Sequence, residues 1–182
     1  VVGGDSASRL VFSGNDTLIA NNGEATVPVI FSGGMGTKYF TGDGGWSSLT
    51  FDSTSSTIIA GRHVLRGAGT PLTVQGIVEL DTGSTIVYSG TSRQTVTPLT
   101  FANLVIDNSS ELSLSGVTTV RRRLDVRNGI LKTATHGLLL GTDASMEESG
   151  SGSVIGEVAA TRVLKQGLRE SFGNLGIEIQ AE

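Results

Sequence analysis

Apolar and polar residues alternate along short stretches of this chain, and Gly, Asn, Asp and Ser separate the stretches. Clear examples are LTVQGIVEL (72–80), STIVYSG (84–90), LTFANLVID (99–107) and ELSLSG (111–116). A period of two is typical of β-strands, whose successive side chains point to opposite faces of a sheet. The strands start about every 8–12 residues, as in sandwiches, barrels and solenoids. The pattern predicts an all-β fold.

Helical periodicity is almost absent from the sequence. The best candidate is GEVAATRVLKQGLRES at 156–171, which contains several good helix formers. Gly167 interrupts it, however, and the segment is equally compatible with two strands around a turn. We therefore expect no helix of structural importance.

An internal repeat of about 50 residues distinguishes among the all-β architectures. Residues 49–80 resemble residues 104–133. At an offset of 55, the matched residues are Leu49 with Leu104, Phe51 with Ile106, Ile59 with Leu114 and Gly61 with Gly116. A repeat of this length corresponds to two or three coils of roughly 20 residues, each of which buries its inner side only by stacking on its neighbours. The repeat favours a parallel β-helix (β-solenoid) with irregular coils.

A β-sandwich is the alternative fold, and the strand lengths are compatible with it. A sandwich predicts no internal repeat, and its immunoglobulin-like form usually has a buried Trp next to a disulfide. The chain has no Cys, and its only Trp, Trp46, lies in GDGGWSSL, which we interpret as a Gly-rich lead-in to a loop. We predict a β-solenoid region over 1–164. Residues 165–182 are predicted to form a C-terminal cap or the start of a following domain.

Composition narrows the range of partners. The net charge is −4, which argues against general affinity for nucleic acid or anionic lipid. No apolar run approaches the roughly 18 residues of a membrane-spanning segment. The absence of Cys excludes disulfides and thiolate metal sites. Hydrophobic residues make up 37% of the chain, below the usual 45–50%, which fits a thin, elongated core.

The segment TVRRRLDVRNG (119–129) concentrates positive charge in this acidic chain. Its four arginines are Arg121, Arg122, Arg123 and Arg127. Alternation predicts that Leu124 and Val126 point inward, that Asp125 points outward with Arg123 and Arg127, and that Arg121 and Arg122 occupy the preceding turn. We expect surface pairing with acidic neighbours, at about 0–1 kcal/mol for each exposed pair. These four arginines are the candidate surface-contact residues, and an anionic glycan is the first candidate ligand.

Other residues with reactive side chains favour structural roles. His63 and His136 have no ligand partner at i+2 or i+4, so we predict no metal site and interpret both as turn or rim residues. β-Helical polysaccharide hydrolases and lyases use clustered carboxylates with Arg or Lys. Here each candidate carboxylate closes or interrupts a strand, where Asp often caps a turn: Asp52, Asp81, Asp107 and Asp125. We predict no catalytic residue and no cofactor.

The order of several motifs in the second half of the chain carries a family resemblance. The motifs are IVYSG (86–90), QTV (94–96), FANLVID (101–107), LSLSG (112–116), LDVRNGILKT (124–133), GLLLG (137–141), SGSGSVIGEVAATRVL (149–164) and SFGNLGIEI (171–179). In this order they resemble the β-helical repeat regions of large cell-surface and secreted proteins of the Bacteroidetes. That resemblance implies a long, exported, adhesin-like protein, commonly sent out by type 9 secretion and in some cases active in gliding motility.

From the residues and the resemblance together we expect a non-catalytic structural or adhesive segment of an exported surface protein. It would act as a stiff stalk or as a ligand-contact surface, outside the cell, within a longer chain. Its expected partners are surface glycans or other cell-surface and outer-membrane secretion proteins, without nucleic acid and without membrane insertion. A polysaccharide-acting or carbohydrate-binding β-helix module is the first alternative, and a fibre or filament subunit is the second.

Overall fold

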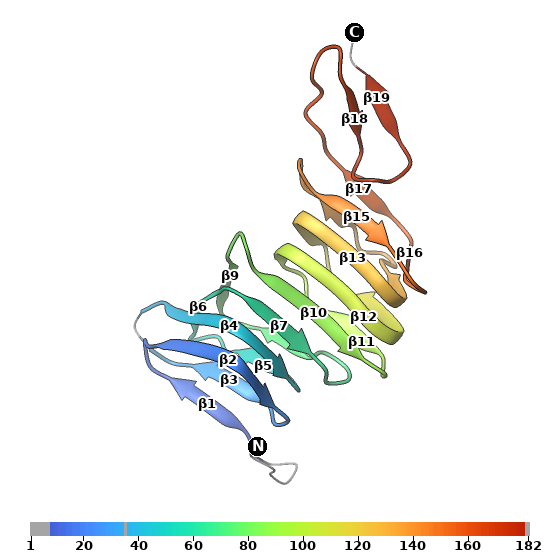
Figure 1. Ribbon diagram of the computed structural model, residues 1–182. Helices are drawn as coiled ribbons and strands as arrows, with labels where there is room; N and C mark the ends of the chain where they lie inside the picture. The colour runs from blue at the N-terminus through green and yellow to red at the C-terminus, as the bar shows by residue number, and fades with distance from the viewer. Residues whose placement is uncertain (1–7, 35, 181–182) are drawn as a thin grey trace.

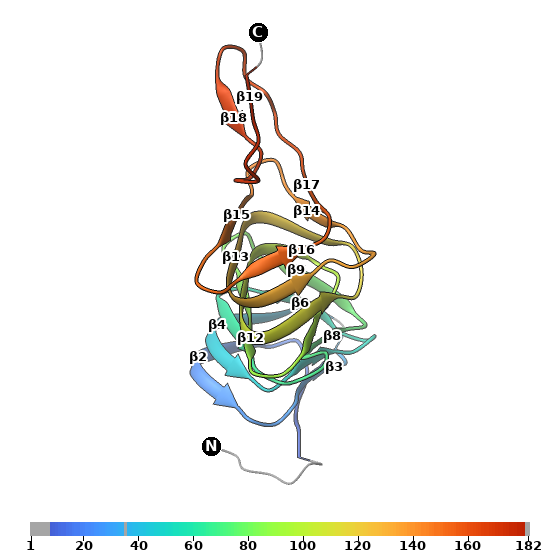
Figure 2. The ribbon, with the colours of Figure 1, turned by 90° about the vertical axis from the view of Figure 1, so that its right-hand side faces the viewer.

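The chain forms a β-solenoid of about eight turns, in which parallel strands of successive coils stack along one axis (Figure 1). The computed structural model describes residues 8–34 and 36–180, and within them there is no helix. Figure 2 shows the coils as loops that close around a common interior. The predicted all-β solenoid is therefore confirmed over the described residues, and the sandwich alternative is wrong.

Each coil has three faces, and each face is a stack of parallel strands. Face 1 carries β1 (Leu10–Ser13), β3 (Val29–Ser32), β5 (Leu49–Phe51), β8 (Leu72–Val74), β11 (Gln94–Val96), the ends of β12 (Thr100–Leu114) and β13 (Thr118–Lys132), and β16 (Ser153–Ile155). Face 2 carries the starts of β2 (Thr17–Ala25) and β4 (Lys38–Trp46), then β6 (Ser56–Ile59), β9 (Ile77–Leu80), the starts of β12 and β13, β14 (Leu138–Leu140) and β17 (Val158–Ala160).

Face 3 is the one that positions the candidate site. It carries the ends of β2 and β4, β7 (Arg62–Leu65), β10 (Thr85–Gly90), the middle parts of β12 and β13, and β15 (Ser145–Glu148). The long strands β12 and β13 continue around the corners between faces, and their registers shift at those bends. All of these strand pairs are parallel, as stacking of successive coils requires.

The unit that repeats in space is the single coil. Strand register places Leu10 beside Val29, Val29 beside Leu49, and Leu49 beside Leu72, so these coils contain 19, 20 and 23 residues. Leu49, by contrast, lies on face 1, whereas Leu104, its match at an offset of 55, lies on face 3. Because all three faces carry the same apolar alternation, the 50-residue match relates similar patterns at different places in the coil.

Inward-pointing side chains form continuous stacks along the solenoid axis. On face 1 the ring of Phe31 stacks between those of Phe12 and Phe51, with centroid distances of 5.5 and 4.7 Å. On face 3 the fully buried Leu104 lies in register with Ile86 in one neighbouring coil and Leu124 in the other. Each coil therefore buries its apolar face against the next, as the thin core predicted from composition requires.

Trp46 and His63 belong to this core, which corrects two sequence interpretations. Trp46 ends β4 and is buried, so it does not lie in a loop lead-in, and His63 in β7 is fully buried, so it is not a rim residue. The indole Nε1 of Trp46 donates to His63 Nδ1 at 3.2 Å. His63 Nε2 therefore carries the ring proton and donates to the carbonyl of Ala60 at 3.0 Å. Burial lowers the pKa of His63, which favours this neutral form.

The C-terminal segment leaves the stack after β17. β18 (Arg169–Ser171) and β19 (Glu178–Gln180) form an antiparallel ribbon that projects from the end of the solenoid (Figure 1). Between them, Gly173 accepts a hydrogen bond from the Met146 amide at 2.8 Å, so this turn lies against β15. The predicted cap region, 165–182, thus contains both a turn that covers the last coil and a ribbon that extends away from it. His136, as expected, lies in a turn, where its amide donates to Thr133.

Candidate surface-contact site

A column of outward-facing residues runs along face 3. One residue from each of seven neighbouring strands lies in register in the order Glu24, Gly45, Val64, Val87, Val105, Asp125 and Glu147, and we call this set the outer column. Its three valines form a small apolar cluster separate from the main core. Although they face outward, they are only 8, 1 and 7% exposed. The centre of face 3 is thus apolar, and its two ends are charged.

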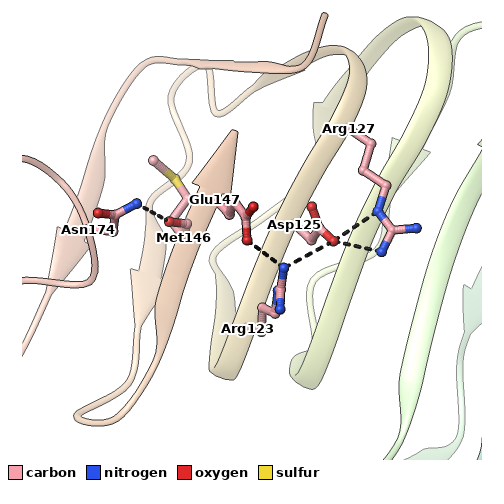
Figure 3. A network of polar contacts seen from close by, with 6 residues as sticks. All are labelled: Arg123, Asp125, Arg127, Met146, Glu147 and Asn174. Carbon is pink, nitrogen blue, oxygen red and sulfur yellow. Dashed lines mark hydrogen bonds and ion pairs between the residues drawn. The ribbon is translucent and has the colours of Figure 1, made fainter. Parts of the chain in front are cut away.

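Asp125 continues the valine series in the next coil and is buried beneath two arginines (Figure 3). Its side chain is 5% exposed, and its Oδ2 accepts a hydrogen bond from Arg127 Nε at 2.9 Å and forms an ion pair with Arg127 Nη2 at 2.8 Å. Arg123 Nη2 lies 3.7 Å from the same oxygen and also binds Glu147 Oε2. The hydrogen bond that Arg127 donates to Asp125 raises the pKa of Arg127. The predicted pairing of Arg123 and Arg127 with acidic neighbours is confirmed.

Arg121 and Arg122 lie elsewhere than expected. They belong to β13, at the bend between faces 2 and 3, and not to a preceding turn. Their guanidinium groups contact the end of β9 and the turn that follows it: Arg121 Nη2 donates to Leu80 O at 2.6 Å, and Arg122 Nη1 donates to Thr82 O at 3.3 Å. Among the described residues, neither guanidinium forms an ion pair. The four arginines therefore divide into a neutralised pair and an unneutralised pair.

The unneutralised pair borders a hollow of about 600 Å³, which we call the arginine hollow. Its lining residues are Thr82, Asn103, Arg121, Arg122, Arg123 and Asp143. Asn103 is fixed there because its Nδ2 donates to Ser84 O at 2.9 Å. Arg127 does not line the hollow. Thr82, Asn103 and Asp143 were not identified from the sequence, although with Arg123 they recur at about the 20-residue period of a coil.

The candidate carboxylates do not converge on one site. Asp52 lies in a turn, where it accepts hydrogen bonds from the amide and hydroxyl of Thr54 at 2.9 and 2.6 Å, and the hydroxyl contact lowers its pKa. Asp81 accepts from the Gly83 amide at 3.1 Å in a similar turn. Asp107 accepts from Asn128 Nδ2 at 2.5 Å on face 3. Hydrogen bonds to turn amides and to neighbouring coils are the structural roles that the strand-end positions predict.

Within residues 8–34 and 36–180, no three His, Cys, Asp or Glu side chains are arranged to hold a metal ion. No described helix is long and apolar enough to cross a membrane. Comparison with family models, with curated proteins and with solved structures gives no match to this chain. The physical argument for function therefore rests on the solenoid and on face 3.

Proposed function

We propose that this chain is a stiff, non-catalytic spacer segment of an exported bacterial surface protein, with an outer surface that can contact glycans or other surface proteins. The observation that carries the proposal is the stack of about eight parallel coils, which one continuous strand ladder joins along face 3. At about 4.8 Å per coil, such a stack spans about 38 Å. The sequence resemblance to β-helical repeat regions of Bacteroidetes surface proteins supports the same role.

Stiffness follows from the way the coils are joined. Most neighbouring coils are hydrogen-bonded through strand ladders on more than one face, as Val29 with Leu49 on face 1 and Val64 with Val87 on face 3 illustrate. Between the coil that carries β8 and β9 and the next coil, the ladders of faces 1 and 2 stop, and the ladder of β10 with β12 on face 3 continues. Bending the stack would open hydrogen bonds on one side and compress side-chain stacks on the other, and the ladder of face 3, which is continuous from β2 to β15, opposes bending along the stack. A rod of this kind holds whatever precedes and follows it at a fixed separation.

The polar residues of the outside are engaged mainly in joining neighbouring coils. Arg66 pairs with Glu24 at 2.9 Å, two coils apart, and Lys132 pairs with Glu111 at 2.7 Å in the adjacent coil. Exposed pairs of this kind contribute about 0–1 kcal/mol each. They keep the surface soluble and set the register of the coils, which is the role expected of a spacer.

Two measurements test this proposal against its alternatives. In the bacterium that encodes the chain, antibodies raised against the segment are expected to label intact cells, and labelling only after lysis would contradict export to the surface. A depolymerisation assay that measures new reducing ends on a panel of polysaccharides is expected to show no turnover. Turnover of any polymer would contradict the spacer proposal and favour the polysaccharide-acting alternative.

A further inference from the structure

The arginine hollow contains two guanidinium groups, those of Arg121 and Arg122, that contact backbone carbonyls and form no ion pair with any described carboxylate. Arg121 is held by the carbonyl of Leu80, and Arg122 by that of Thr82. A guanidinium has five N–H donors, and each of these contacts uses one of them. Backbone carbonyls are neutral, so they position the two groups without cancelling their charge.

We propose that the arginine hollow binds a single anionic group, a carboxylate or a sulfate, carried by an oligosaccharide. This site would give the proposed glycan contact a defined place, so it rests on that part of the proposed function and not on the stiffness of the spacer. Planar guanidinium groups donate paired hydrogen bonds to the oxygens of such anions, and these charge-assisted bonds are about twice as strong as neutral ones. Because the short contact to the Leu80 carbonyl holds Arg121 in place, little of its side-chain freedom remains to be lost on binding.

The size and lining of the hollow favour a sugar as the carrier of the anion. A volume of about 600 Å³ lies within the roughly 300–1,000 Å³ of small-molecule sites. Thr82 and Asn103 add neutral polar groups to the wall, beside the two arginines. These neutral groups match the hydroxyls that surround each charged group of an acidic oligosaccharide.

The surrounding carboxylates argue against nucleic acid as the ligand. Asp143 lies in the wall of the hollow itself, and Glu147 lies beside Arg123, which also lines the hollow. Duplex DNA carries a charge about every 1.7 Å along its axis, so a bound duplex would bring phosphates against these carboxylates. An anion separated from the next by neutral sugar atoms avoids that repulsion.

The test is calorimetric titration of the whole chain with defined oligosaccharides. The probes are a sulfated hexasaccharide from heparin, a hexamer of galacturonic acid, an uncharged hexamer of glucose and a single-stranded DNA oligonucleotide. The test variant, R121Q/R122Q, removes the two cations of the hollow that form no ion pair. The matched control, R62Q/R66Q, removes one arginine from β7 and the arginine that directly follows β7. Neither of these residues lines the hollow. Inorganic sulfate, titrated in parallel, shows whether the anion alone is sufficient.

We expect at least one anionic hexamer to bind, the uncharged hexamer not to bind, and R121Q/R122Q to weaken binding by about tenfold or more, since charge-assisted contacts are lost. The control variant is expected to stay within about twofold of the wild type, because exposed charges away from the site are screened by salt. The relative affinities of the sulfated and carboxylated probes identify the anion.

Several results would overturn the proposal. These are equal weakening by the control variant, binding of the uncharged hexamer at equal strength, tighter binding of the oligonucleotide than of any saccharide, or no binding of either anionic hexamer. Unfolding of R121Q/R122Q would be detected by its thermal midpoint. The single variant R122Q then replaces it, because the Arg122 contact is the longer of the two and is exposed.

Discussion

Substitution of Asp125 tests how the arginines of face 3 stabilise the fold. Asp125 occupies the outer column directly after Val105, and its carboxylate is buried beneath Arg123 and Arg127. Asp125→Ala removes the carboxylate and leaves a gap in the column. Asp125→Val also removes the carboxylate, but it continues the series of valines. The two variants therefore separate the loss of charge from the loss of packing.

The expected losses of stability follow from the solvent exposure of the two arginines that contact Asp125. Breaking a fully buried ion pair costs about 3–5 kcal/mol. Here the side chains of Arg123 and Arg127 are 53 and 48% exposed, so water solvates them once the carboxylate is gone. We therefore expect a cost of about 2 kcal/mol for Asp125→Ala. Valine buries two methyl groups against Val105 and suits a parallel strand, so Asp125→Val is expected within about 1 kcal/mol of the wild type.

Thermal unfolding followed by circular dichroism measures both variants. In a chain of this size, 1 kcal/mol corresponds to about 2–4 °C in Tm, so Asp125→Ala is expected to lower Tm by about 4–8 °C and Asp125→Val by no more than about half of that. An Asp125→Val variant as unstable as Asp125→Ala, or less stable, would refute the view that packing in the outer column compensates for the lost carboxylate.

Three further predictions concern the core and the corners. Burial lowers the pKa of His63 below 6.5, so the neutral ring stabilises the fold fully above pH 6.5 and this stabilisation is lost as the pH falls further. Between pH 7.5 and 5.5 the free energy of unfolding should therefore decrease, by up to about 1.4 kcal/mol for each pH unit. The dependence of the free energy of unfolding on pH should become weaker in His63→Phe. An unchanged dependence would contradict the conclusion that His63 is buried in its neutral form. Gly61→Ala should destabilise the chain by about 2 kcal/mol or more in urea titrations, because φ is +89° and a Cβ would lie 2.1 Å from the Gly42 carbonyl oxygen, whereas Gly23→Ala, with open space around it, should have little effect. Phe31→Ala should cost about 3–5 kcal/mol by removing the middle ring of the face 1 stack, and a loss below 1 kcal/mol would contradict that packing.

Strand positions could be predicted from the sequence because alternation has a direct physical cause. Leu124 and Val126 point inward and Asp125 points outward, as a period of two requires. The three-faced coil was harder to recognise, since each face has the same alternation and a match between two segments does not identify the face. Leu49 and Leu104 illustrate this, because they share a pattern and lie on different faces.

Contacts between coils could not be predicted, since they join residues far apart in sequence. The hydrogen bond from Arg121 to Leu80 joins residues 41 positions apart, and the one from Arg122 to Thr82 joins residues 40 positions apart. The burial of His63 was missed for a related reason: its partner, Trp46, lies on a neighbouring coil and supplies the hydrogen bond that makes a core histidine acceptable. Alignment of the sequence at a period of about 20 residues would have brought several of these residues into correspondence.

The spacing of coils along face 3 tests the central claim most directly. Glu24 and Glu147 are the two ends of the outer column, separated by six steps between neighbouring strands. At about 4.8 Å per step their Cα atoms should lie about 29 Å apart. The chain has no native Cys, so spin labels at E24C and E147C allow this distance to be measured by pulsed electron paramagnetic resonance. A stiff solenoid predicts one narrow distribution centred on that separation, after allowance for the labels, and a broad distribution or one centred elsewhere would contradict it.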